Sequence, residues 1–137
     1  MIASDVREAA ENLYKVRLTN EPEACIELFH PEGILRIAGE ANVENIPDAA
    51  EGRPAIDVAV RTLVADWRWL ELDLKSVVVE GQQAAVRYDV TVMHGPTGET
   101  LALEVMDHIR FDENFAILEF VEFLDTARVA ALGAGPG

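Results

Sequence analysis

The sequence has few cations and a single cysteine. Its 137 residues include 11 Lys and Arg against 25 Asp and Glu, which gives a formal net charge of −14. Nucleic acids and anionic membranes attract clustered positive charge, so this balance argues against both kinds of partner. A solvated acidic exterior is the simpler interpretation. Cys25 lies in the apolar run ACIELF and has no second cysteine to pair with, which fits a reducing compartment.

Long hydrophobic runs are also absent. No stretch approaches the roughly 18 apolar residues of a membrane span, and residues 1–13 lack the apolar core of a signal peptide. We therefore expect a cytoplasmic protein. The histidines at 30, 94 and 108 are scattered, and no Gly-rich phosphate loop follows an expected strand. No metal and no other cofactor is expected on these grounds.

The length fits one domain over residues 1–137, with an ordered core at about 5–128 and a frayed C-terminal tail at 129–137. Apolar residues at helical spacing, with Ser4 and Pro54 as start signals, predict helices first. These helices are expected over residues 5–19, 22–29 and 54–66. A short strand is expected at 34–37, followed by a polar loop at 39–53.

After the third helix the hydrophobic period changes to two, which is typical of β-strands. Strands are predicted over residues 70–75, 84–93, 101–111 and 116–124. Three helices followed by four antiparallel strands indicate an α+β fold in which the helices cover one face of a curved sheet. Such a sheet leaves a conical cavity beneath the helices, and an apolar cavity with a few polar groups is the default binding site.

Three segments carry a family resemblance: FHPEG at 29–33, EGRPAI at 51–56, and DHIRFDENFAILEFVEFLD at 107–125. Their order and spacing resemble the nuclear transport factor 2-like superfamily over about residues 5–128. This superfamily includes ketosteroid isomerases, SnoaL-like polyketide cyclases and limonene-epoxide-type hydrolases. The resemblance implies a cone-shaped domain, with three N-terminal helices packed on a curved, mainly antiparallel sheet. It also implies a pocket inside the cone and a homodimer formed through the outer face of the sheet.

Asp107 is the first candidate site residue. Strict alternation places it on the face of its strand that carries Val105, Ile109 and other apolar residues. An ionised, unpaired carboxylate there would cost several kcal/mol, so the group must be protonated, paired or exposed to a wet cavity. By resemblance, Asp107 matches the isomerase acid that donates a hydrogen bond to a developing oxyanion. A structural role for this carboxyl is the alternative.

Tyr14 resembles the tyrosine of the same oxyanion hole, although a tyrosine on an amphipathic helix is more often a core residue. The isomerase's general base has no counterpart near Ile37, and Glu40 is the closest acid. Glu122 offers another acid or base, and the resemblance assigns its face of the last strand to the pocket. A carboxyl in apolar surroundings has a pKa raised toward neutrality, which suits it to proton transfer.

The segment Arg87-Tyr88-Asp89 resembles the R-x-D of limonene-epoxide-type hydrolases. Residue by residue, the resemblance adds Glu122 as the second acid and Asn45 as the residue that holds a water. Alternation leaves two possibilities for this strand. Either Arg87 and Asp89 face the cone, or Val86 and Tyr88 do, with the other set on the outer face.

These residues favour a small, cofactor-independent enzyme that performs acid/base chemistry, such as isomerisation or cyclisation, on a small apolar substrate. Asp107 and Tyr14 would stabilise an oxyanion or donate a proton, and Glu122, with Asp89, would move the proton. We expect the substrate to contact Trp67, Val105, Phe120, Leu124 and Asn45. Two alternatives remain at this point: an epoxide hydrolase that uses Arg87, Asp89 and Glu122, and a non-catalytic ligand-binding or dimerisation module.

Overall fold

One curved, six-stranded sheet dominates the computed structural model, which describes residues 3–38 and 49–133. The strands follow the order β2 (Ala49–Glu51), β1 (Phe29–Ile37), β6 (Ile117–Phe123), β5 (Thr100–Phe111), β4 (Gln83–His94) and β3 (Trp67–Glu80). Neighbouring strands are antiparallel except β1 and β6, which run parallel. The expected α+β fold with a mainly antiparallel sheet is confirmed.

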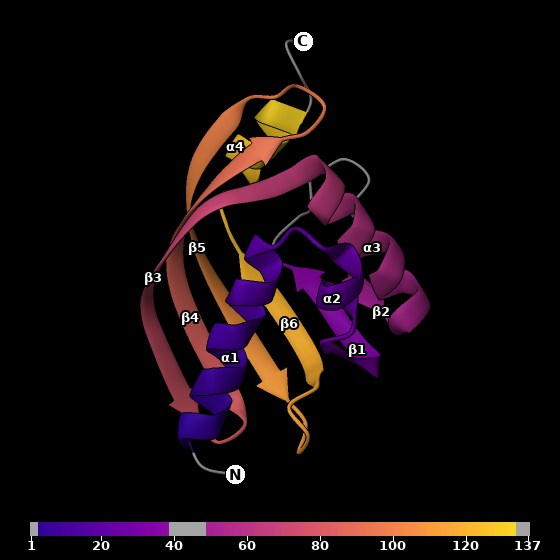
Figure 1. The fold of residues 1–137 in the computed structure, drawn as a ribbon, viewed down its shortest axis with the longest axis vertical. Helices are drawn as coiled ribbons and strands as arrows, with labels where there is room; N and C mark the ends of the chain where they lie inside the picture. The colour runs from indigo at the N-terminus through magenta and orange to yellow at the C-terminus, as the bar shows by residue number, and fades with distance from the viewer. Residues whose placement is uncertain (1–2, 39–48, 134–137) are drawn as a thin grey trace.

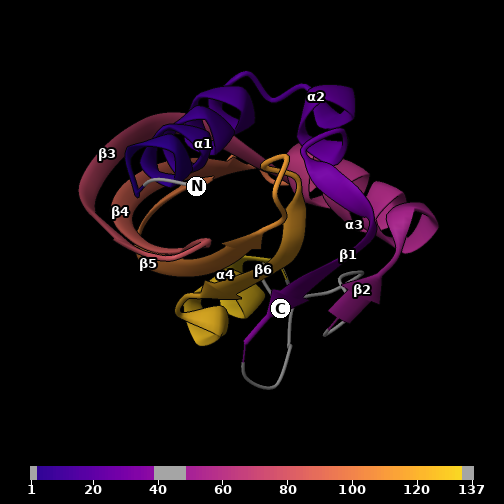
Figure 2. The same ribbon diagram turned by 90° about the horizontal axis from the view of Figure 1, so that it is seen from below.

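The helices α1 (Ala3–Leu18), α2 (Pro22–Ile26) and α3 (Arg53–Asp66) cover the concave side of this sheet (Figure 1). Seen from below, β3, β4 and β5 curve around one side while α1 lies across the opening (Figure 2). The buried residues of α1 recur at helical spacing, as Val6, Ala10, Leu13 and Tyr14. This single apolar stripe fixes which side of α1 faces the sheet.

The antiparallel part is a meander of long strands with tight connections. Gly81 joins β3 to β4 with a φ of 58°, a left-handed conformation that glycine adopts without steric cost. Along β4, Ala84, Val86, Tyr88 and alternate residues beyond them are buried, while the residues between them are more exposed. The inner face of β4 is therefore its apolar face.

The region around β1 differs from the sequence prediction. Helix α2 ends at Ile26, before the expected residue 29, and β1 begins at Phe29 and includes residues 30–33, which lie before the expected strand at 34–37. A Cβ on Gly33 would lie 2.8 Å from the carbonyl oxygen of Ile117, so a larger residue could not approach β6 as closely. The amide of Gly52 donates to the carbonyl of Gly33, and this pairing extends into β2, a strand that was not predicted.

The C-terminal segment also differs from the expectation of a frayed tail. Residues Thr126–Gly133 form the short helix α4, and Val129 is buried against the core. Helix α4 brings residues after β6 back over one end of the sheet (Figure 1). The ordered core thus extends beyond residue 128.

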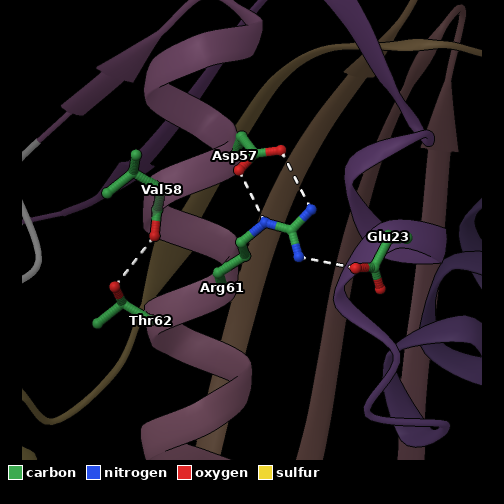
Figure 3. A network of polar contacts seen from close by, with 5 residues as sticks. All are labelled: Glu23, Asp57, Val58, Arg61 and Thr62. Carbon is green, nitrogen blue, oxygen red and sulfur yellow. Dashed lines mark hydrogen bonds and ion pairs between the residues drawn. The ribbon is translucent and has the colours of Figure 1, made fainter.

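An exposed network joins α2 to α3 (Figure 3). Arg61 on α3 contacts Asp57 one turn earlier at 2.8 Å and Glu23 on α2 at 2.7 Å. Exposed ion pairs add little to stability, so this network contributes little to holding the fold together. No helix among residues 3–38 and 49–133 is both long and apolar enough to cross a membrane.

Candidate active site

A cavity of about 120 Å³ lies between the helices and the concave face of the sheet. Its walls are almost wholly apolar, and four of the expected contact residues line it: Trp67, Val105, Phe120 and Leu124. An apolar cavity of about 150 Å³ holds benzene, so this somewhat smaller one accommodates a ligand of up to about that size. Asn45, the fifth expected contact residue, lies outside the described residues.

Glu122 brings a carboxyl group into the apolar wall of this cavity. It lies on β6 directly opposite Asp107 on β5. Directly opposed residues of antiparallel strands point to the same face, with their Cβ atoms about 5 Å apart. The two carboxyl groups therefore share the concave face of the sheet.

Each carboxyl accepts a hydrogen bond from its own tyrosine. The Tyr14 hydroxyl on α1 donates to Oδ2 of Asp107 at 2.6 Å. The Tyr88 hydroxyl on β4 donates to Oε1 of Glu122 at 3.2 Å. The two tyrosine rings are tilted against each other with their centroids 4.9 Å apart. The four side chains form one polar group in otherwise apolar surroundings, in which Tyr14, Tyr88 and Asp107 are buried and Glu122 is half-buried.

Burial is the main cause of the pKa shifts in this group. It raises the pKa of Asp107 well above its usual range, and the neighbouring Glu122 raises it further, while the bonded hydroxyl of Tyr14 and the nearby hydroxyl of Tyr88 oppose the shift. Burial also raises the pKa of Glu122, against the opposing effects of Arg17 and Tyr88. Because both carboxyls are shifted in the same direction, ionising the pair fully is unfavourable.

The two carboxyls differ in access. Asp107 is 0% exposed, and neither it nor Tyr14 lines the cavity. Oδ1 of Asp107 has no hydrogen-bond partner among the described residues, a costly arrangement for a charged carboxylate and an acceptable one for a neutral acid. In this structure Asp107 and Tyr14 therefore support the site from behind its wall, and Glu122 is the carboxyl that a ligand can touch.

Arg17 is the second charged group in the cavity wall. It extends from the last turn of α1, and its guanidinium carbon lies 4.8 Å from the ring centre of Trp69. Trp69 in turn lies 5.4 Å from the ring of Tyr88. The cavity thus has a cation on one element and a carboxyl on another.

The predicted epoxide-hydrolase residues Arg87 and Asp89 do not join the site. Their side chains are 46% and 52% exposed on the outer face, where Arg87 lies 4.0 Å from Glu104 and Asp89 lies 3.7 Å from Lys75. The inner face of β4 is instead formed by Tyr88 and its apolar neighbours, because burying apolar side chains is favourable and burying two charges is not. Of the two possibilities that alternation left open, the structure has Val86 and Tyr88 on the inner face, so Arg87 and Asp89 do not take the catalytic roles expected for them.

Sequence reasoning missed two residues that the structure brings to the site. Tyr88 was named only as one possible inward residue of β4, with no role for its hydroxyl. Arg17 follows Leu13 by four residues and Tyr14 by three, so helical spacing alone places it on the buried stripe of α1. A cation at such a position was a signal available in the sequence.

Among residues 3–38 and 49–133, no cluster of three or more His, Cys, Asp or Glu side chains is arranged to hold a metal ion. The polar groups of the site are instead carboxyls, tyrosine hydroxyls and one guanidinium. Such a set can transfer protons and bind a charged or polar oxygen.

The sequence profile of the SnoaL-like domain matches residues 10–131, and the chain therefore belongs to this family of the nuclear transport factor 2-like superfamily. No curated protein matches the sequence at a significant level.

Solved structures with this fold are numerous and distant in sequence. A proposed isomerase from Bacillus subtilis has a TM-score of 0.80 and 14% identity, with 97% of each chain covered. A proposed SnoaL-like polyketide cyclase from Jannaschia sp. CCS1 has a TM-score of 0.79 and 17% identity, covering 99% of this chain and 96% of that one. SalBIII, an epoxide hydrolase/cyclase-like enzyme of pyran ring formation in salinomycin, has a TM-score of 0.73 and 14% identity, covering 90% and 93%. At these identities the likeness establishes the fold.

Proposed function

We propose that the protein is a cofactor-independent acid/base enzyme that moves a proton on a small apolar substrate, with Glu122 as the catalytic residue. One observation carries this proposal: Glu122 is the carboxyl in the cavity wall, and burial raises its pKa. A general acid or base works best when its pKa lies near the working pH, and such groups contribute roughly 10² to 10⁴ in rate. Membership of the SnoaL-like family and the isomerase and cyclase neighbours support this reaction class.

In the proposed reaction the Glu122 carboxylate removes a proton from a carbon next to a carbonyl group. The electrons of the broken C–H bond form a C=C bond, and the carbonyl oxygen becomes an enolate oxygen. Glu122, now a carboxylic acid, returns the proton to the same carbon or to another carbon of the enolate, and the second course isomerises the substrate. The proton that Glu122 removes is returned, and the substrate is neither oxidised nor reduced overall. The reaction therefore needs no redox partner.

Asp107, Tyr14 and Tyr88 act as positioning residues in this scheme. The Tyr88 hydroxyl holds Oε1 of Glu122 and opposes the rise of its pKa. Asp107, fixed by Tyr14, fills the space behind Glu122, and burial raises its pKa, which disfavours a second negative charge there. Burial in the apolar cavity thus favours the protonated form of Glu122, and Arg17 and the Tyr88 hydroxyl oppose it.

Hydrogen exchange provides the test. Small cyclic ketones such as cyclopentanone and cyclohexanone are incubated with the protein in D₂O, and NMR follows deuterium uptake next to the carbonyl. We expect the wild type to accelerate exchange and Glu122→Gln to lose this acceleration by roughly 10² to 10⁴. Equal exchange with both proteins, in samples of equal thermal stability, would favour the non-catalytic binding module.

We further propose that the protein is a homodimer in solution, in which the two subunits pack together through the outer faces of their sheets. Met106 and Phe123 lie opposite each other there and are both exposed, an unusual position for two large apolar side chains. Sedimentation analysis of the wild type and of Met106→Glu tests this arrangement. A wild type that sediments as a monomer contradicts it.

A further inference from the structure

Arg17 is held in place by neutral groups. Its Nη1 donates to Oδ1 of Asn20 at 3.0 Å, and its Nη2 donates to the carbonyl of Trp67 at 2.7 Å. The guanidinium also lies over the ring of Trp69. These contacts fix the orientation of the side chain. The two hydrogen bonds use two of its five N–H donors, which leaves the other three for a ligand or water.

No carboxylate among residues 3–38 and 49–133 lies within ion-pair distance of Arg17. The ion pairs that the structure contains are on the exterior, where they involve other cations. Burial lowers the pKa of Arg17, but a guanidinium remains charged at any ordinary pH. Arg17 is half-buried, and a charge that is partly withdrawn from water without a counter-charge is stabilised when an anion enters beside it.

Glu122 faces the same cavity, and its negative charge opposes the lowering of the Arg17 pKa that burial causes. Arg17 in turn lowers the pKa of Glu122. The two groups are close enough to influence each other and too far apart to pair. A ligand between them would therefore meet a cation on the α1 side and a proton acceptor on the β6 side.

We propose that Arg17 is the anion-binding group of this cavity, and that the natural ligand is a small, mostly apolar molecule with one negatively charged oxygen, a carboxylate or an enolate. Arg17 binds the oxygen while the apolar body fills the space beside Trp67 and Phe120. In the reaction proposed above, the oxygen is the enolate oxygen that forms when Glu122 removes the proton. The enolate form rests on that proposed function, whereas carboxylate binding does not.

A matched pair of probes separates charge from shape. Benzoate and benzamide have nearly the same size, which suits a cavity that accommodates a small ring, and only benzoate carries a charge. Calorimetric titration of the wild type should give tighter binding of benzoate by roughly tenfold to hundredfold, the value of one hydrogen-bonded charge contact. This comparison needs no variant. Benzoate that does not bind, or that binds no more tightly than benzamide, overturns the proposal.

Variants then assign the effect to one residue. Arg17→Met should remove the preference for benzoate, and Arg17→Lys should retain part of it. Arg68→Met is the matched control, because Arg68 is exposed on β3 between the two tryptophans. Far-UV circular dichroism and urea unfolding identify variants that fail to fold. A folded Arg17→Met that retains the preference, or an equal loss in Arg68→Met, also overturns the proposal.

Glu122→Gln distinguishes this proposal from the proposed function. It removes negative charge from the cavity, so benzoate should bind at least as tightly as to the wild type even though proton transfer is lost.

Binding is located by Cys25, the single cysteine of the chain, which also lines the cavity. Benzoate should slow its alkylation, and an unchanged alkylation rate places the ligand elsewhere and overturns the proposal. Anion selectivity without exchange activity would contradict only the proposed catalysis.

Discussion

Asp107 and Glu122 occupy directly opposed positions on β5 and β6, yet only Glu122 lines the cavity. Asp107 is fully buried and accepts its hydrogen bond from Tyr14, while Glu122 accepts one from Tyr88. Two carboxyl groups at neighbouring positions are thus given different environments. Separate environments are the usual means by which proteins give two carboxyls separate roles.

The stability of the fold should depend on the protonation of Asp107. Because burial raises its pKa in the folded state, the folded protein keeps a proton that the unfolded chain releases above about pH 3.9. The stability that this group contributes is fully present below that pH. It falls by up to about 1.4 kcal/mol per pH unit as the pH rises toward the folded pKa.

Asp107→Asn keeps the shape of the side chain and removes this titration. Urea unfolding of both proteins between about pH 4 and pH 8 should show the variant gaining stability relative to the wild type as the pH rises. Parallel stability curves across this range would mean that Asp107 is ionised in the folded protein.

The two tyrosines should have separable effects on proton transfer. Tyr88→Phe removes a hydrogen bond that lowers the pKa of Glu122, so this pKa should rise. The limb of the pH–rate profile that reports deprotonation of Glu122 should then move to higher pH. Tyr14→Phe serves as the matched control, because Tyr14 bonds Asp107 instead.

We expect Tyr14→Phe to leave that limb in place and to reduce the free energy of unfolding by about 1 to 3 kcal/mol, the cost of a lost buried hydrogen bond. Ketone exchange measured against pH, together with urea unfolding, gives both quantities. Equal shifts of the limb in both variants would show that the hydroxyls do not act separately.

Arg87 and Asp89 should be dispensable for the chemistry of the cavity. Both are exposed on the outer face of β4, with the strand backbone between them and the cavity. Arg87→Met and Asp89→Asn should therefore leave ketone exchange and benzoate binding unchanged within error. Formation of a diol from a small cyclic epoxide by the wild type, lost in either variant, would restore the epoxide-hydrolase interpretation.

Much of the fold and part of the site could be predicted from residue patterns. Period-two alternation places Asp107 on the buried face of its strand, because Val105 and Ile109 fix that face. Helical spacing places Tyr14 on the core side of α1. The helical period and the strand period also predict most of the residues that line the cavity, once the curvature of the sheet is known.

Other features depend on tertiary pairing that a single sequence does not contain. For β4, alternation does not decide whether Val86 and Tyr88 or Arg87 and Asp89 face inward. The answer depends on which side of the sheet the helices cover. Strand β2 has three residues and forms only because the irregular β1 pairs with it. Helix α4 is ordered by the burial of Val129, which depends on elements distant in sequence.

The pKa of Glu122 shows most directly whether this cavity carboxyl is suited to proton transfer. NMR titration of the side-chain carboxyl carbons, with Glu122→Gln to assign the resonance, should give Glu122 a pKa clearly above the value of about 4.3 that is usual for glutamate. The Tyr88→Phe variant should raise it further. A Glu122 that titrates at the usual value, unchanged by Tyr88→Phe, would contradict its proposed catalytic role.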